Sequence, residues 1–171
     1  DLRKAGINSS IIIMNPELTA FKTMFDYKLE PEVYSFHLLE ELIKAAGREG
    51  VSNFPIHIKI DTGMHRLGFA PEEIPALVDR LHRQSAVIPR SVFSHLVGSD
   101  AERFDLFTRR QIETFENASA ELQAGFSHKI LRHICNTAGI ERYPGAQFDM
   151  VRLGIGLYGI DPFTNKILHN V

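Results

Sequence analysis

Short apolar runs alternate along the chain with longer stretches in which apolar residues recur at helical spacing. The runs are four to eight residues long and are bounded by Gly, Pro, Asn or Ser, which is typical of buried strands. The strands they predict are Ile11–Met14, Pro31–Ser35, a run that includes Lys59, Ser91–His95, Lys129–Asn136 and Met150–Leu153. Strands separated by helices indicate a parallel array of about six βα units, an α/β fold.

Helical spacing predicts one helix after residue 14 and three longer ones over residues 36–46, 71–84 and 104–123. Gly47 and Gly50 are expected to end the second helix of the chain. The side chains expected to face the sheet are Phe36, Leu39, Leu42, Ile43 and Ala46, then Ile74, Leu77, Val78 and Leu81, then Phe107, Phe115, Ala118 and Leu122.

The strand that includes Lys59 has two chemically different faces. A period of two puts Ile56, Ile58 and Ile60 on one face and His57, Lys59 and Asp61 on the other. In an α/β barrel, outer helices would cover the isoleucines, and the inward polar groups would gather at the carboxyl end, where such barrels carry their active sites. Gly63 then allows a tight turn that brings Arg66 back over the strand end.

Composition limits the class of protein. A chain of 171 residues with 44% hydrophobic residues and a net charge of −2 is predicted to be one domain, 1–171. It has no basic excess for nucleic acid, and no apolar segment of the roughly 20 residues that cross a membrane. Cys135 is the only cysteine, so we expect a cytoplasmic protein. Without a leading methionine, the chain is interpreted as a piece of a longer polypeptide.

The run from His57 to Gly68 resembles the K-x-D-T-G-M-x-R-x-G signature of alanine racemases, pyridoxal-phosphate enzymes built on a (β/α)8 TIM barrel. Three more segments match that family in order. They are Ser94-His95, Asn136-Thr137-Ala138 and the stretch from Phe148 to Gly159. The resemblance implies a partial barrel, from the third to the eighth strand, without the family's carboxyl-terminal β domain.

The resemblance also implies a site for the phosphate of the cofactor. The backbone N–H groups of Gly154, Ile155 and Gly156 would approach the phosphate, since glycine allows close contact, and Thr137 would add its hydroxyl. Taken alone, Gly154-Ile155-Gly156 would be better explained as a glycine-rich turn after a strand.

Three basic residues receive roles by the same resemblance. Arg152 would face the pyridine nitrogen; because guanidinium only donates hydrogen bonds, that nitrogen would stay unprotonated and the ring would be a weak electron sink, which suits racemisation. Arg66 would reach the phenolic oxygen of the cofactor and the substrate carboxylate. Lys59 would be carried as a carbamate, a negative group that pairs with Arg66.

His95 and His133 are expected to support Arg152 and the cofactor ring, and Asn136 to lie near the cofactor. His65 departs from the family, because many relatives have glycine there. The histidines show no H-x3-H spacing and the chain no C-x2-C pair, so the sequence does not favour zinc.

Two catalytic groups of the family have no counterpart in these residues. The Schiff-base lysine belongs to a motif A-x-x-K-A-x-A-Y-G, and the opposing tyrosine to the carboxyl-terminal domain. We therefore expect the parent protein to interconvert L- and D-alanine for peptidoglycan synthesis, and the isolated chain to be inactive. Open strand edges of a partial barrel and the shared active site of the family favour a homodimer.

Two other functions remain open. One is another pyridoxal-phosphate barrel, such as a D-amino-acid aldolase, a decarboxylase or a small carrier protein of the cofactor. The other is a noncatalytic racemase-like domain fused to a ligase. The D-T-G-M-x-R-x-G and R-x-G-I-x-L-Y-G segments favour the racemase.

Overall fold

Five parallel strands form one curved sheet, in the order in which they occur along the chain. The computed structural model describes residues 1–164, 166 and 167. The strands are β1 (Ile11–Ile13), β2 (Leu29–Val33), β3 (Phe54–Lys59), β4 (Val87–Phe93) and β5 (Leu131–His133). This sequential parallel order is that of consecutive βα units in a partial barrel, which confirms the predicted α/β fold class.

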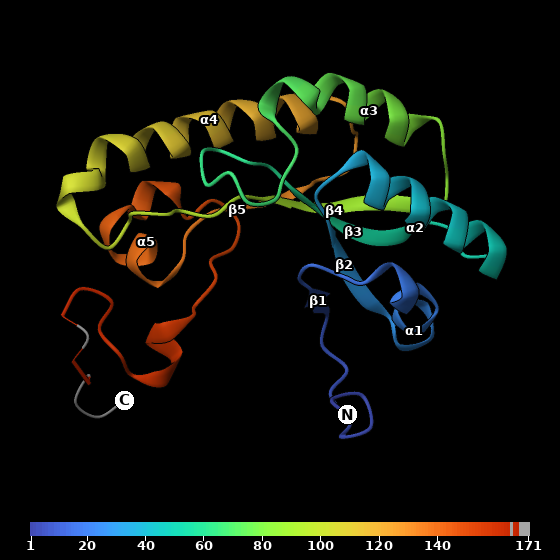
Figure 1. Ribbon diagram of the computed structural model, residues 1–171, viewed down its shortest axis with the longest axis horizontal. Coiled ribbons are helices and arrows are strands. Elements are labelled where there is room, and N and C mark those ends of the chain that lie inside the picture. Colours follow the sequence, from blue (N-terminus) through green and yellow to red (C-terminus); the bar gives the residue numbers. More distant parts are fainter. Residues whose placement is uncertain (165, 168–171) are drawn as a thin grey trace.

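Helices connect successive strands, as the periodicity predicts. They are α1 (Phe21–Tyr27), α2 (Phe36–Glu49), α3 (Ile74–His82), α4 (Asp105–Ala124) and α5 (Thr137–Arg142). Figure 1 shows α3 and α4 lying along one side of the sheet, while both ends of the drawn chain lie on the other side. Among the described residues, none of the helices combines the length and apolar composition that a membrane crossing requires.

The core lies between the sheet and these helices. Ile56, Ile58 and Ile60 are fully buried and pack in one cluster with residues of α2, α3 and α4. The helical residues that are fully buried there are Leu39, Leu42, Ile74, Leu77, Phe115 and Leu122. The predicted stripe is therefore confirmed at these positions, and the opposite face of β3 is left to its polar side chains.

Two details of the predicted helices are wrong. Helix α2 continues through Gly47 and ends at Gly50, whose φ of 66° is the left-handed conformation that stops helices. Phe107 is 39% exposed, because Thr108 and Gln111 occupy the side of α4 that faces the sheet.

The predicted sixth strand, Met150–Leu153, is also wrong. The segment runs beside β5 but forms no ladder: the N–H of Asp149 donates to Arg132 O at 3.0 Å, and that of Arg152 to Cys135 O at 3.0 Å. These two bonds are three residues apart, whereas a parallel ladder repeats every two residues. Phe148 has a φ of 49°, so the chain turns sharply just before the segment.

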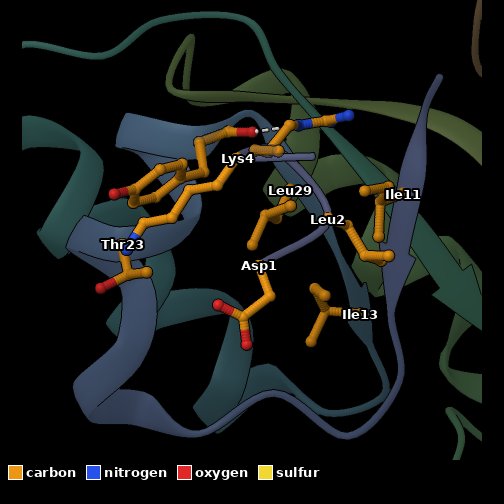
Figure 2. Close-up of a pocket in the computed structure, with 9 residues that line it drawn as sticks. Asp1, Leu2, Lys4, Ile11, Ile13, Thr23 and Leu29 are labelled. Atoms are coloured by element: carbon orange, nitrogen blue, oxygen red, sulfur yellow. Dashed lines mark hydrogen bonds between the residues drawn. The ribbon is translucent and has the colours of Figure 1, made fainter. Parts of the chain in front are cut away.

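The sheet has β1 and β5 at its two edges. Near the β1 edge, a pocket of about 360 Å³ opens between residues 1–4, α1 and β2 (Figure 2). Its apolar lining comes mainly from Leu2, Ile11, Ile13 and Leu29. None of the predicted site residues lines it, so the candidate site lies elsewhere.

Candidate functional site

The loop after β3 folds back on the end of its own strand. The carboxylate Oδ1 of Asp61 accepts the backbone N–H of Gly63 at 2.9 Å and of His65 at 3.0 Å. Gly63 has a φ of 125°, as the predicted turn requires. The loop closes where the N–H of Phe69 donates to Lys59 O at 2.9 Å and that of Asp61 donates to Phe69 O at 2.9 Å.

His65 takes a conformation that glycine would take more easily. Its φ is 53°, in the left-handed region, and its side chain is 85% exposed. The ring Nδ1 lies 3.3 Å from Oδ2 of Asp61, so a local contact accompanies this conformation. The departure from the family's glycine is therefore accommodated by a turn that points the larger side chain outward.

Lys59 pairs with a carboxylate that the sequence did not single out. Its Nζ lies 2.9 Å from Oε1 of Glu32 on β2, and the two side chains are only 6% and 1% exposed. The second oxygen of Glu32 accepts the N–H of Asn15 at 2.6 Å. Arg66 is exposed and makes no ion pair within the described residues, so the expected contact between Lys59 and Arg66 is not observed.

Arg152 is anchored by both terminal nitrogens of its guanidinium. Nη1 donates to Nδ1 of His133 at 2.5 Å and to its carbonyl oxygen at 3.3 Å. Nη2 donates to the carbonyl oxygens of Ser94 at 2.6 Å and Ile134 at 3.1 Å. Four of its five N–H groups are thus used, and Nε–H has no partner among the described residues. Burial lowers the pKa of Arg152 to about 10, so it is charged at neutral pH.

His133 holds Arg152 and is itself fixed by packing. Its ring stacks on Phe93 with 4.9 Å between centroids and 2° between planes. Burial, and secondly the charge of Arg152, lower the pKa of His133 to about 3. The ring is therefore neutral and contacts Arg152, while its role in supporting a cofactor ring stays a prediction.

His95 does not contact Arg152 through its side chain within the described residues. Burial lowers its pKa to about 4, followed by the charges of Arg152, Arg66 and Lys59. Lys59, Arg66 and Arg152 thus all lower the pKa of the His95 ring. The backbone oxygen of His95 accepts a hydrogen bond from Nε2 of Gln111 at 3.1 Å, which fixes the end of β4 against α4.

Asn136 caps helix α5. Its Oδ1 accepts the N–H of Gly139 at 3.0 Å and the hydroxyl of Ser99 at 2.7 Å, while Nδ2 donates to Leu96 O at 3.1 Å. These bonds occupy the side chain, so the structure gives Asn136 an observed structural role beside the predicted site.

Thr137 accepts two hydrogen bonds from the backbone of the predicted phosphate loop. Its Oγ1 accepts the N–H of Gly154 at 3.0 Å and of Gly156 at 3.2 Å. A side chain on Gly156 would come within 2.6 Å of Thr137, so the approach requires glycine there. Two N–H groups converging on one oxygen form the kind of cradle that binds an anion, with the threonine oxygen standing in for an anionic oxygen.

One pocket brings most of the predicted cofactor residues together. It has a volume of about 380 Å³ and is lined by His95, Asn136, Thr137, Gly154 and Ile155, with neighbours from the end of β4. The cradle and the cations around His95 favour a ligand that carries an anionic group such as phosphate, while Asp100 adds one carboxylate to the pocket lining. The residues present therefore fit a phosphorylated cofactor, without any group of three metal-binding side chains among the described residues.

Sequence reasoning missed the polar residues that hold the site together. Gln111 of α4 donates to Thr62 Oγ1 at 3.3 Å, and Thr62 lies 2.8 Å from Ser94 Oγ. Glu32 was missed because strand β2 was identified only by its extended character. The signal available was an acidic residue at every second position of β2, next to the basic residues of β3.

Acid should destabilise the protein through its buried neutral histidines. His57 and His133 are 3% and 1% exposed, and burial is the largest cause of their lowered pKa values. Because both pKa values lie below the unfolded value of about 6.5, the unfolded chain binds more protons below that pH. Stability is then complete above pH 6.5 and falls as the pH decreases, by at most about 1.4 kcal/mol per pH unit for each ring.

From pH 7 to 5.5 we expect His133 to remove about 1 kcal/mol and His57 to add to this loss, measured by urea unfolding at each pH. His133→Gln should flatten this dependence, whereas His37→Gln, at an exposed position of α2, should leave it unchanged. Equal unfolding free energies at the two pH values would contradict the neutral state of the buried rings.

Known proteins match the chain over nearly its whole length. Residues 1–162 match the family model described as alanine racemase, N-terminal domain. The alanine racemase of Treponema denticola is 34% identical over 165 residues, which cover 95% of this chain and 43% of that protein. Alanine racemase 1 of Oceanobacillus iheyensis is 35% identical over 164 residues, covering 94% and 43%.

Solved structures agree. The alanine racemase of Clostridium difficile 630 superposes with a TM-score of 0.86 at 28% identity, covering 96% of this chain and 43% of that one. The chain thus spans less than half the length of the relatives it matches. The family match over residues 1–162, together with these relatives, shows that the chain belongs to the alanine racemase family.

Proposed function

We propose that the polypeptide that carries this chain is a pyridoxal-phosphate-dependent alanine racemase, with this chain as the central part of its barrel. The observation that carries the proposal is an anion cradle that lines one pocket, with the anchored guanidinium of Arg152 two residues before Gly154 of that lining. Family membership supports the reaction, the interconversion of L- and D-alanine. In this proposal the strands correspond to the third and following strands of the barrel.

Thr137, the glycine-rich loop and the neighbouring Arg152 each have a proposed task. Thr137 and the backbone of Gly154, Ile155 and Gly156 would hold the phosphate, the oxygen of Thr137 giving up the N–H groups of Gly154 and Gly156 that it now accepts. Arg152 would donate Nε–H to the ring nitrogen, since its other N–H groups are bound to protein. Bound there, pyridoxal phosphate supplies an electron-withdrawing ring that acidifies the α-proton of the substrate.

The remaining predicted residues border the pocket or the loop beside it. Arg66, exposed on the loop after β3, is free to reach a carboxylate. His95 would stay neutral beside it, and Asn136 would hold α5 in place. Carbamylation of Lys59 remains a prediction; its ion pair with Glu32 favours the ammonium form, because a carbamate would bring two negative charges together.

The proposal extends to the whole protein. We propose that residues 1–171 alone do not racemise alanine, because the lysine and tyrosine motifs of the family are not among them. The parent would act as a homodimer in the cytoplasm and supply D-alanine for peptidoglycan. The unpaired edges of β1 and β5 support an arrangement in which further chain or a second subunit covers them.

The test is to express the whole polypeptide and measure D-alanine formed from L-alanine with and without pyridoxal phosphate. We expect cofactor-dependent racemisation, and Arg152→Lys should lower the rate by about a hundredfold, or about 2.7 kcal/mol, because lysine cannot replace the four guanidinium bonds. Arg110→Lys, on the exposed face of α4, is the matched control.

Other outcomes separate the alternatives. Release of carbon dioxide or of an aldehyde from an amino acid would replace the racemase by a decarboxylase or an aldolase. Cofactor binding without turnover would favour a carrier protein. Absence of both binding and turnover in the whole polypeptide would favour a noncatalytic domain.

A further inference from the structure

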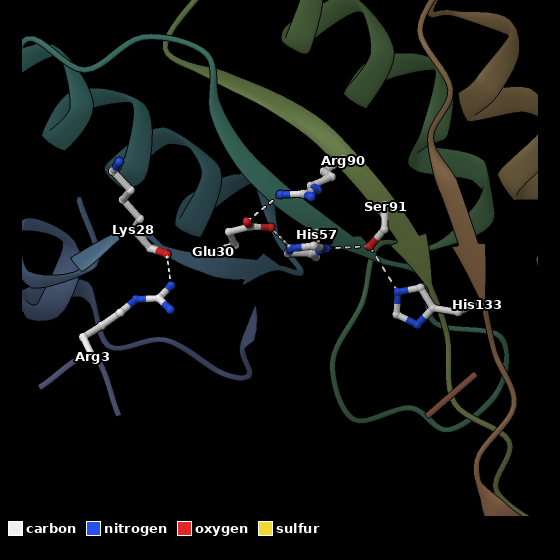
Figure 3. Close-up of polar contacts among 7 residues, drawn as sticks. All are labelled: Arg3, Lys28, Glu30, His57, Arg90, Ser91 and His133. Atoms are coloured by element: carbon white, nitrogen blue, oxygen red, sulfur yellow. Dashed lines mark hydrogen bonds and ion pairs between the residues drawn. The ribbon is translucent and has the colours of Figure 1, made fainter. Parts of the chain in front are cut away.

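A row of buried polar side chains crosses the sheet from β2 to β5 and reaches the candidate site at His133. Glu30, His57, Ser91 and His133 come from β2, β3, β4 and β5, and each is at most 5% exposed. Figure 3 shows them in line, each pointing to the next. Oε2 of Glu30 lies 2.8 Å from Nε2 of His57, whose Nδ1 lies 2.6 Å from Ser91 Oγ. Ser91 Oγ lies 3.1 Å from Nε2 of His133.

The chemistry at one end of the row fixes the protons on His133. A guanidinium can only donate, so Nδ1 of His133 must accept from Arg152. A neutral imidazole has one N–H, which then has to be on Nε2. His133 therefore donates to Ser91.

The other end fixes His57 in the same way. Oε1 of Glu30 accepts a hydrogen bond from Nη1 of Arg90 at 2.7 Å, and a carboxylate paired with arginine only accepts. Nε2 of His57 must then carry the proton and donate to Glu30, which leaves Nδ1 as an acceptor. The single proton of the Ser91 hydroxyl fills that position, so every hydrogen bond of the row has one direction.

A bulge in β4 positions Ser91 of the row and Arg90, which contacts Glu30 of the row. Ile56 pairs with Pro89 and His57 with Ser91, so Arg90 is an extra residue in β4, a bulge. Bulges re-aim side chains. Here the bulge lets consecutive residues, Arg90 and Ser91, both contact the same row.

We propose that Glu30, His57 and Ser91 are positioning residues for Arg152, acting through the orientation and proton arrangement of His133. All hydrogen bonds of the row point the same way, with donors running from the guanidinium beyond β5 toward the carboxylate on β2. Its effect on a reaction depends on the proposed function, but the arrangement of protons does not.

The first test determines the tautomers directly. Solid-state NMR of the whole polypeptide, labelled with ¹⁵N in its histidine rings, is recorded at pH 7. We expect His57 and His133 both neutral with the proton on Nε2, each ring assigned by its loss in His57→Asn and His133→Asn. A charged ring, or a proton on Nδ1 of either one, would overturn the proposal.

Two variants test the direction of the row. In Glu30→Gln, Arg90 should hold the amide oxygen and turn the NH2 group toward His57, which then has to move its proton to Nδ1. In Ser91→Ala, Nε2–H of His133 loses its acceptor and its ¹⁵N resonance should shift. Ser119→Ala is the matched control, because Ser119 is also fully buried but bonds within α4. Unchanged spectra in Glu30→Gln or Ser91→Ala would exclude the corresponding residue from the row.

The last experiment measures how the row affects the kinetics of alanine racemisation. With the cofactor bound, Ser91→Ala should lower kcat for alanine on the order of tenfold with little change in KM, and Ser119→Ala should not. An unchanged kcat in Ser91→Ala would contradict a positioning role. If the unaltered polypeptide does not racemise alanine at all, the proposed function fails, while the histidine spectra still decide whether the row exists.

Discussion

Gly68→Ala is expected to destabilise the protein by more than about 3 kcal/mol, or to prevent folding. Gly68 has a φ of 137°, which an L-residue with a side chain rarely adopts. A Cβ atom there would lie 2.4 Å from the backbone nitrogen of Asp61 and 2.7 Å from the carbonyl carbon of Ile60. Because both atoms belong to the strand end itself, the clash cannot be relieved by turning a side chain.

The matched control is Gly47→Ala. Gly47 lies inside α2, and the space that a Cβ atom would enter there holds no other atom within 4 Å, so alanine should stabilise the helix by about 0.5 to 1 kcal/mol. Urea unfolding followed by circular dichroism measures both changes. A loss below about 1 kcal/mol in Gly68→Ala would mean that the loop can move away from β3, and the described closure would be wrong.

The sequence pattern predicted strand β3 and its two faces correctly because one physical rule decides both. Side chains alternate along a strand, and Ile56, Ile58 and Ile60 could only be buried together. The same rule then forces His57 and Lys59 inward. Periodicity also located the helices, since their apolar stripes are long enough to outweigh single exceptions such as Phe107.

The pairs formed by these inward side chains could not be predicted from one strand. Glu30 contacts His57, and Glu32 contacts Lys59, with the same separation of 27 residues in both cases. This separation is set by the register of β2 against β3, in which Glu32 is the Cα partner of His57. Register depends on how the strands pack, which local patterns do not encode.

In the segment from Met150 to Leu153, the local pattern predicted an element that the structure does not contain. Its apolar residues match a short strand, yet only tertiary contacts decide whether a ladder forms. Here Arg152 directs its guanidinium to the ends of β4 and β5, and the backbone follows that anchor. The strand prediction rested on the short apolar run and on the family resemblance, and neither decides whether a ladder forms. The place of Arg152 beside His133 does not depend on a ladder.

Glu32→Gln should cost about 3 to 5 kcal/mol of unfolding free energy, because it leaves the buried charge of Lys59 without its counter-charge. Oε2 of Glu32 accepts the N–H of Asn15, whereas Oε1 forms only the ion pair with Lys59 and makes no hydrogen bond among the described residues. The amide oxygen of glutamine can still accept the N–H of Asn15, so the cost comes from the lost counter-charge of Lys59. The matched control is Glu49→Gln, whose exposed contact with Lys22 at 3.1 Å should contribute little to stability.

The same variant distinguishes the two states of Lys59. If Lys59 is an ammonium, Glu32→Gln destabilises, and the double variant Glu32→Gln with Lys59→Met recovers part of the loss because no buried charge is left unpaired. If Lys59 is a carbamate, the unaltered protein holds two neighbouring anions, and Glu32→Gln stabilises it by removing their repulsion. Urea unfolding with and without added bicarbonate measures the sign. The 2.9 Å contact between Nζ and Oε1 leads us to expect destabilisation under both conditions.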